Sequence, residues 1–474
     1  MVFTGFKVEL NNFLETVTPS ILPQRPTLMP PLLHMTRLRL DQRNASRVAK
    51  ILFAGLGLAL LSGCKVFNLS GNQSTMVTEG PVARTQWDIF MVTVWVTMGI
   101  FVVVGAVLAY AQWKFRAKPS DAGKAEMPHQ GHGNPLIEIG LIAASIVLLA
   151  FIAIPTLKGI WYTHDVPEAE KGNALEITAT GYQWWFKFEY PSEMVQLPNN
   201  NGEVPLVTGN ELVVPVGVPV RVNLRTVDVI HSFWIPKLAG KVDMIPNRAN
   251  HLWFKADKPG YFYGQCAEYC GESHAIMRFR VVALEPQAYA AWVAAQKQSA
   301  RTVTAEQVAS ANAPKVKFAS YEPKAGEALA ATESFEADPF GSWQKRQPAQ
   351  PATEDAALIA DGRRLFSEKT CSNCHTVRGH VGAGINGPDL THVGSRSTIA
   401  AGVLENTPER MHAWIKNPEY YKPGNKMSHG INGMAGYFKY ENGKPVMKDG
   451  EHVLNFTLND QEIDALVAYL QSLK

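Results

Sequence analysis

The sequence contains little cysteine and has almost no surplus of charge. Only five of its 474 residues are cysteines, and its formal net charge at pH 7 is +3. A nearly balanced charge without a dense basic patch argues against nucleic acid as a partner, because phosphate neutralisation needs clustered Lys and Arg. The length exceeds that of one typical domain, so we expect two or three folded units.

The five cysteines leave no pair for a structural disulfide bond. Cys64 ends a short apolar segment, Cys266 and Cys270 lie near His and Met residues, and Cys371 and Cys374 precede a His. An odd number of cysteines in an exported protein normally leaves one unpaired thiol. Here each cysteine has a separate chemical context, which indicates lipid, metal and cofactor attachment.

The N-terminal region is typical of an exported lipoprotein. A basic segment precedes an apolar stretch at residues 51–61, and Leu-Ser-Gly-Cys64 follows, which is the layout of a signal peptide. The last four residues resemble the bacterial lipobox, which implies cleavage before Cys64 and lipid on its sulfur; an apolar segment with an incidental cysteine is the alternative. Residues 1–34 lie upstream, so we interpret 1–63 as a signal peptide after a start codon assigned too early, and 64–86 as the lipidated segment.

Two long apolar runs predict membrane-spanning helices. Residues 89–111 carry no charge, and about 20 such residues cross a hydrocarbon core of about 30 Å. A second span covers residues 136–157. Basic side chains between the spans place their connection on the cytoplasmic side, so the chain after residue 160 faces outward. We expect an α-hairpin anchor over residues 87–160.

Short strand-like runs follow residue 172, separated by Gly, Pro and Asn, and they predict a β-sandwich or barrel. The runs are residues 175–179, 184–190, 212–214, 220–224, 251–255 and 279–284.

Soft metal ligands gather within this region. Cys266, Cys270, His274 and Met277 are close in sequence, and His231 precedes them by about one strand and loop. Two thiolates, two imidazoles and a thioether favour copper over hard cations. The gap between the cysteines suits a loop whose sulfurs bridge two metal ions, with a backbone carbonyl as a further ligand. Structural zinc is the alternative.

The segment resembles subunit II of cytochrome c oxidases, in which the motif C-x-E-x-C-x-x-x-H-x-x-M holds a dinuclear copper centre on a cupredoxin sandwich. The resemblance includes the two-span anchor and implies an all-β cupredoxin domain over residues 173–285. The copper ligands that it implies are His231, Cys266, the carbonyl of Glu268, Cys270, His274 and Met277.

The same resemblance implies three further roles. The Glu268 side chain matches an acid that reaches a magnesium ion at the boundary with the catalytic subunit. Trp184 matches the residue through which electrons arrive, although an aromatic strand residue is more often part of a core. Glu138 matches an acid at the mouth of a proton pathway; the Trp-Thr pair that usually follows it is missing, and an acid near the interface can simply be solvated.

Residues 286–353 are rich in Ala, Gln, Pro and Ser and predict a linker, with some helix around residues 289–296. A flexible tether keeps the next module close to the copper site without fixing one pose.

The module after the linker contains Cys371-Ser-Asn-Cys374-His375, the form of covalent c-type haem attachment, in which the thiols bind the haem and the histidine binds iron.

The surrounding chain, residues 354–474, resembles a class I cytochrome c and implies an all-α domain with one haem. The features that carry the resemblance are Gly362 and Phe366, residues 387–390, residues 414–418, and a final helix with Ile463, Leu466, Val467 and Leu470 on one face.

The sixth iron ligand should be a thioether, because His/Met coordination raises the reduction potential and blocks oxygen from the iron. Met427 matches the family's position for this ligand. Ser428 follows it where relatives often have proline. Met434, His429 and His380 are the alternatives.

Together these resemblances imply the electron-accepting subunit of a haem-copper oxidase in a bacterial cytoplasmic membrane, with its copper and haem domains on the periplasmic side. Electrons pass from a cytochrome c or a quinol-oxidising complex to haem c, then to two coppers, then to a haem in catalytic subunit I. Oxygen reduction and proton pumping belong to the complex with subunit I and other oxidase subunits, since the chain has no run of His-bearing spans.

Two alternatives fit parts of the pattern. A copper subunit of a nitric oxide reductase relative would use a similar module with another catalytic partner. A copper-delivery or sensor lipoprotein would bind metal without turnover, although the fused haem argues against it. A quinol-oxidising relative is disfavoured because that branch lacks the copper ligands, which are present here.

We expect the mature protein to begin at Cys64 with lipid on its sulfur, since the signal-peptide layout ends there. Mass spectrometry of the N-terminal peptide from the purified membrane protein tests this expectation. A Cys64→Ala variant is the control and should lack the lipid mass. Peptides from residues 1–34 on the mature protein would contradict the interpretation.

Overall fold

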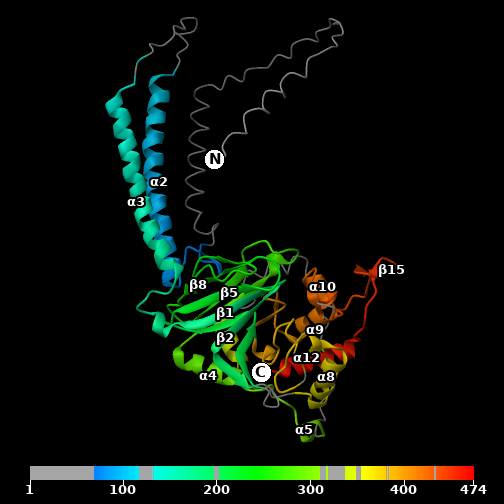
Figure 1. Cartoon of the computed structure of the whole chain (residues 1–474). Coiled ribbons are helices and arrows are strands. Elements are labelled where there is room, and N and C mark those ends of the chain that lie inside the picture. Colours follow the sequence, from blue (N-terminus) through cyan, green and yellow to red (C-terminus); the bar gives the residue numbers. More distant parts are fainter. Residues whose placement is uncertain are drawn as a thin grey trace, which may run out of the picture. The chain divides into compact units, whose positions relative to one another are not determined.

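The computed structural model describes residues 69–116, 131, 133–196, 202–309, 317–318, 337–347, 354–380, 382, 384–431 and 434–474. They form two long helices, a β-sandwich and a mainly helical C-terminal region (Figure 1). The predicted multidomain fold class is therefore confirmed. The predicted lipid site, Cys64, lies outside the described residues.

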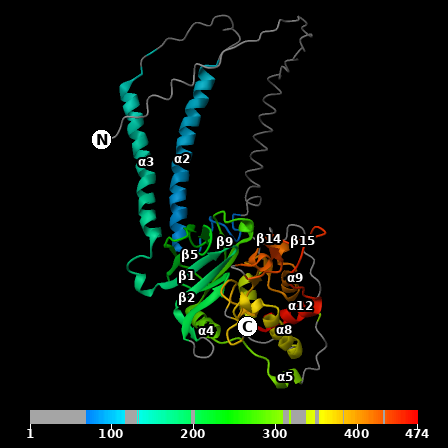
Figure 2. The ribbon, with the colours of Figure 1, turned by 45° about the vertical axis from the view of Figure 1, so that its right-hand side comes forward.

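Two long apolar helices lie side by side in both views (Figures 1 and 2). Helix α2 spans Pro81–Lys114 and helix α3 spans Pro135–His164. With 34 and 30 residues, each is long and apolar enough to cross a membrane. Large side chains such as Phe101 and Leu149 are exposed around these helices, as expected for helices that face lipid.

The predicted copper domain, called the copper domain below, consists of two five-stranded sheets, with the strand orders β3-β2-β1-β5-β8 and β4-β10-β9-β6-β7. Strands β1 and β5 are parallel, as are β4 and β10, and the other neighbouring pairs are antiparallel. The bounds are β1 Leu175–Tyr182, β2 Trp185–Gln196, β3 Glu203–Gly209, β4 Glu211–Pro215, β5 Val220–Thr226, β6 His231–Trp234, β7 Val242–Met244, β8 Asn250–Phe254, β9 Gly260–Cys266 and β10 Arg278–Leu284.

An aromatic core joins the two sheets. Phe186 and Phe188 alternate with less buried residues along β2, as expected for a strand with one face on the core. Across the interior, the rings of Phe233 and Phe279 stack with centroids 4.6 Å apart, and Phe279 is 4.9 Å from Phe186. Because Phe233 pairs with Cys266 between β6 and β9, this core fixes the register of strands that carry predicted metal ligands.

The C-terminal domain is built around two crossing helices, α8 (Ala356–Glu368) and α12 (Asp460–Ser472) (Figure 2). Gly362 lies at the crossing, where an added Cβ would be 1.9 Å from the Ala465 carbonyl oxygen. The predicted apolar face of the last helix is buried against α8 and its neighbours. The shorter elements are η5 Cys371–Asn373, η6 Val393–Ser395, β11 Thr398–Ile399, β12 Leu404–Glu405, α9 Pro408–Lys416, α10 Pro418–Tyr421, α11 Lys426–His429, β13 Tyr440–Glu441, β14 Lys444–Pro445, β15 Met447–Lys448 and β16 Glu451–His452.

The region between the two domains contains ordered segments. Helices α4 (Pro286–Gln296), α5 (Ala305–Ala309) and α7 (Pro339–Arg346) all fall within the predicted linker. Trp343 of α7 is 2% exposed and belongs to the core of the copper domain. This part of the chain is therefore packed on the copper domain at α4 and α7.

Replacing Gly362 with Ala should destabilise the C-terminal domain by ~1–3 kcal/mol, the usual effect of overpacking a rigid contact, because the new methyl group meets the backbone of α12. Thermal unfolding followed by the haem absorption measures the effect. Gly172→Ala is the control, since nothing lies within 4 Å of a Cβ there. An unchanged unfolding temperature in Gly362→Ala would contradict the close helix crossing.

Candidate functional site

The loop between β9 and β10 brings soft sulfur ligands together. Cys266 ends β9, Cys270 lies in the loop, and Met277 directly precedes β10. The two cysteine Sγ atoms are 3.7 Å apart, and the Met277 Sδ atom is 3.8 Å from the Cys270 Sγ atom. All three side chains are buried.

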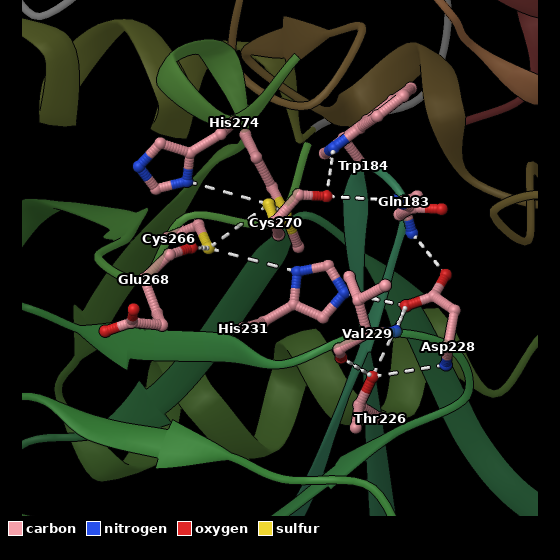
Figure 3. Close-up of polar contacts among 11 residues, drawn as sticks. Gln183, Trp184, Thr226, Asp228, Val229, His231, Cys266, Glu268, Cys270 and His274 are labelled. Carbon is pink, nitrogen blue, oxygen red and sulfur yellow. Dashed lines mark hydrogen bonds and ion pairs between the residues drawn. The ribbon is translucent and has the colours of Figure 1, made fainter. Parts of the chain in front are cut away.

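Two imidazole rings approach this sulfur pair from different elements (Figure 3). His231 opens β6, and its Nδ1 atom is 3.9 Å from the Cys266 Sγ atom. His274 opens the short helix η4 (His274–Ile276), and its Nδ1 atom is 3.6 Å from the Cys270 Sγ atom. The carbonyl oxygen of Glu268 is 3.2 Å from the Cys266 Sγ atom. The structure thus places all six predicted copper ligands around one small volume.

The chemistry of these donors fits copper. Thiolate, thioether and imidazole donors are soft or borderline ligands that suit copper. A structural zinc site has four ligands in a tetrahedron, whereas here two Cys, two His, a Met and a carbonyl oxygen converge. Each cysteine sulfur also faces its own histidine.

The two thiols titrate as a coupled pair. A hydrogen bond between the sulfurs lowers the pKa of Cys266, with a further contribution from His231, and the same contact together with burial raises the pKa of Cys270. The protein alone therefore stabilises one thiolate and keeps the other sulfur protonated. Metal binding must displace that proton, because a bound cation takes cysteine as thiolate.

Asp228 orients His231 from the side away from the sulfurs (Figure 3). Its Oδ1 atom is 2.8 Å from the His231 Nε2 atom, and its Oδ2 atom accepts a hydrogen bond from the Gln183 backbone N–H at 2.7 Å. Burial opposes ionisation, but these hydrogen bonds outweigh it and leave the pKa of Asp228 lowered. An ionised Asp228 holds the proton on Nε2 and leaves Nδ1 free for a metal. Asp228 was not among the predicted residues, although its position three residues before His231 was a usable signal.

Trp184 contacts the same loop. Its indole Nε1–H donates to the Cys270 carbonyl oxygen at 3.1 Å, and the Gln183 side-chain amide donates to that oxygen at 2.8 Å. The indole is 6% exposed and belongs to the core of the copper domain. Trp184 is thus a core residue that also hydrogen-bonds to Cys270, a predicted copper ligand.

The two predicted acidic sites lie apart from the sulfurs. The Glu268 carboxylate points away from them (Figure 3). Its Oε2 atom is 3.5 Å from the Lys241 Nζ atom. Glu138 lies in the first turn of α3 and is exposed. These positions leave both predicted roles open.

A second site is a cavity in the C-terminal domain that the C-x-x-C-H motif lines. Cys371, Cys374 and His375 form one side of the cavity, and Met427 from α11 also lines it. The His375 Nδ1–H donates to the Pro388 carbonyl oxygen at 2.8 Å, and burial lowers the pKa of His375. The imidazole is therefore neutral and oriented, with Nε2 free to bind iron. The apolar walls suit a porphyrin and include Phe366, Leu390, Ile399, Trp414, Leu466 and Leu470.

The three alternatives for the sixth iron ligand do not line this cavity in the described part of the chain. Within the part of the chain that the structure describes, Met427 lines the cavity, whereas Met434, His429 and His380 do not. Both histidine rings hydrogen-bond to other side chains. Met411, which was not predicted, lines the cavity from α9, and its sulfur accepts a hydrogen bond from a side-chain amide of α12.

Comparison with known proteins finds the same two modules. Residues 175–284 match the family described as cytochrome c oxidase subunit II, periplasmic domain, and residues 359–474 match the cytochrome c family.

Relatives in other bacteria extend over both modules. Cytochrome c oxidase subunit 2 of Alkalihalophilus pseudofirmus is 32% identical over 91% of this chain and 98% of its own length. The protein of the same name from Bacillus subtilis is 29% identical over 90% of this chain and 97% of its own. The crystal structure of the periplasmic domain of subunit II of cytochrome oxidase from Bradyrhizobium japonicum is 40% identical, covers 26% of this chain and 93% of its own, and has a TM-score of 0.22.

Replacing Asp228 with Asn should weaken copper binding about 10- to 100-fold, as is typical when the carboxylate behind a ligating histidine is lost. Titrating the copper-loaded full chain with a chelator measures the change. Asp257→Asn is the matched control, because this exposed carboxylate pairs with Arg84 away from the sulfurs. Equal chelator resistance in Asp228→Asn and the unmodified protein would show that His231 needs no such support.

Proposed function

The chain belongs to the cytochrome c oxidase subunit 2 family, and from that premise we propose that it takes electrons at haem c and passes them to a dinuclear copper centre. From there they reach a haem in the catalytic subunit, where the complex reduces oxygen to water. One observation carries this proposal: Trp184 hydrogen-bonds to Cys270 and also lines the cavity that contains Met427. The two sites are therefore adjacent in one chain.

When bound, the copper pair and the haem each supply one-electron redox chemistry. The protein's part is to hold and orient them. Cys266, Cys270, His231, His274 and Met277 are the side chains that would hold the two copper ions, and the Sγ separation of 3.7 Å supports this. The Glu268 carbonyl oxygen is proposed to complete this set.

Haem c would be attached through Cys371 and Cys374, and His375 and Met427 are the residues that would bind its iron. The hydrogen bond from His375 to the Pro388 carbonyl supports this, because it keeps the proton on Nδ1. The apolar walls would keep water away from a bound haem, which would favour electron transfer over oxygen binding.

The membrane anchor and the boundary with the catalytic subunit complete the proposal. Lipid at Cys64 and the helices α2 and α3 anchor the chain, so that the metal-binding domains lie in the periplasm. The outward-pointing Glu268 carboxylate supports a magnesium site toward subunit I, and Glu138 is proposed as the entrance of a proton pathway. The electron donor is a cytochrome c or a quinol-oxidising complex.

The full chain purified in detergent should contain two copper ions and one iron, with the absorption spectrum of a c-type haem. Cys270→Ser should lose the mixed-valence copper signal but keep the haem spectrum, since it removes a bridging sulfur from the copper site alone. Met427→Ala tests the haem site in the same way. This variant should keep its copper, and carbon monoxide should bind to its haem iron. Zinc in place of copper, or copper that dialyses away, would favour metal storage or sensing instead.

The purified complex should consume oxygen with electrons that arrive through this chain. Turnover should be lost in Cys270→Ser, because electrons no longer leave the haem. Nitric oxide consumption in place of oxygen consumption would assign the chain to a nitric oxide reductase relative.

A further inference from the structure

The end of strand β3 in the copper domain lies against the C-terminal domain at a point close to the haem ligand. A Cβ atom added at Gly209 would be 2.7 Å from the Pro388 Cβ atom. Pro388 supplies the carbonyl oxygen that accepts the His375 Nδ1–H at 2.8 Å. Backbone of the copper domain therefore packs directly against the residue that orients the predicted iron ligand.

The copper domain also forms part of the cavity wall. Gln183, Trp184 and Trp185, together with Gly209 and Asn210, line the same cavity as the C-x-x-C-H motif. These residues lie in the β1–β2 and β3–β4 turns and at the strand ends beside them. Two neighbouring turns of the sandwich thus close one side of the haem cavity.

A buried carboxylate holds this wall in place. Glu211 opens β4 and is 7% exposed. Its Oε1 atom accepts a hydrogen bond from the Trp343 indole N–H of α7 at 2.9 Å, and its Oε2 atom accepts from the Ser397 backbone N–H and hydroxyl, each at 3.3 Å. We call Glu211, Trp343 and Ser397 the Glu211 joint. Burying a carboxylate costs much free energy unless hydrogen-bond donors surround it. The Glu211 joint therefore depends on β4, α7 and the segment at Ser397 coming together.

A second set of contacts lies next to the copper ligands. The Ser273 hydroxyl donates to the Pro423 carbonyl oxygen at 2.6 Å, and the Lys422 ammonium donates to the Ile276 carbonyl oxygen at 3.4 Å. Lys422 is 4% exposed. These bonds join the copper-ligand loop to the segment that leads to Met427, so the two domains are connected at two separate places.

We propose that the copper domain is a structural part of the haem site: Gly209 supports Pro388 and through it His375, while the Glu211 joint holds the two domains in one docked position. The inference rests on the proposed function only in taking the cavity as the haem site. It replaces a freely moving tether with a fixed contact, and a donor must then reach the haem from a side other than the copper domain.

The first test is Gly209→Val in the full chain loaded with copper and haem. The added side chain meets the rigid Pro388 ring, so it should separate the domains and admit water to the haem. Because water favours the oxidised, more highly charged haem iron, we expect the haem reduction potential to shift downward. Gly172→Val is the control, since Gly172 lies just before the copper domain with nothing within 4 Å of an added Cβ, and it should leave the potential unchanged.

The second test is Glu211→Gln, measured by hydrogen exchange of the Ser397 amide. Loss of a charge-assisted hydrogen bond in the Glu211 joint should speed this exchange about tenfold. Glu203→Gln, an exposed carboxylate on β3, the strand that precedes β4 in the chain, should not change it. The copper signal reports that the copper domain is folded in every variant.

The outcomes separate this inference from the function on which it rests. A haem potential and a Ser397 exchange rate that both stay unchanged, in a chain that holds copper and haem, would overturn the docked arrangement and leave the electron relay intact. Absence of haem or copper from the unmodified chain would overturn the relay itself. If Gly209→Val does not fold, the exchange rate of the Ser397 amide in Glu211→Gln alone decides whether the two domains are docked.

Discussion

Two buried cysteine sulfurs lie 3.7 Å apart in the loop between β9 and β10. Two thiolates at this distance would repel each other strongly in a poorly solvated setting, and in the protein alone the hydrogen bond between the sulfurs lowers the pKa of Cys266 and raises that of Cys270. A bridging cation removes the conflict. The surrounding sandwich supplies the rigidity that such a site needs, because the stacked rings of Phe233 and Phe279 hold β6, β9 and β10 in register.

The cavity of the C-terminal domain likewise depends on close packing and on an oriented imidazole. Its helices α8 and α12 cross closely at Gly362, and the surroundings of the half-buried His375 lower its pKa. Orientation of that ring comes from one backbone carbonyl, that of Pro388. In both sites a hydrogen bond to the far side of an imidazole selects which nitrogen can bind a metal.

The two sites share a boundary. Trp184 hydrogen-bonds to the copper-ligand loop and lines the other cavity, and the Glu211 joint ties α7 and Ser397 to β4. Carrying both centres on one chain removes the need for a diffusional encounter between them. Because Trp343 is packed in the core of the copper domain, the two sites are held close together by the fold as well as by the chain that connects the domains.

The sequence by itself determined the features that are local along the chain. The spacing of Cys266, Cys270, His274 and Met277, the C-x-x-C-H motif and the two apolar runs each depend on neighbouring residues, so the two modules, the anchor and the fold class could be predicted. Strands β3, β6, β7 and β9 were not predicted, because they are short or lack a clear alternating pattern and are held by their neighbours in the sheets.

Only the tertiary structure decided how distant segments combine. Asp228 supports His231 because a turn folds it behind the ring, and Met427 lines the cavity while Met434 does not. The contact of Gly209 with Pro388 and the bonds of Glu211 to Trp343 and Ser397 join residues more than 100 positions apart. No local pattern encodes such pairs, because they exist only where packing of the two cores brings separate surfaces together.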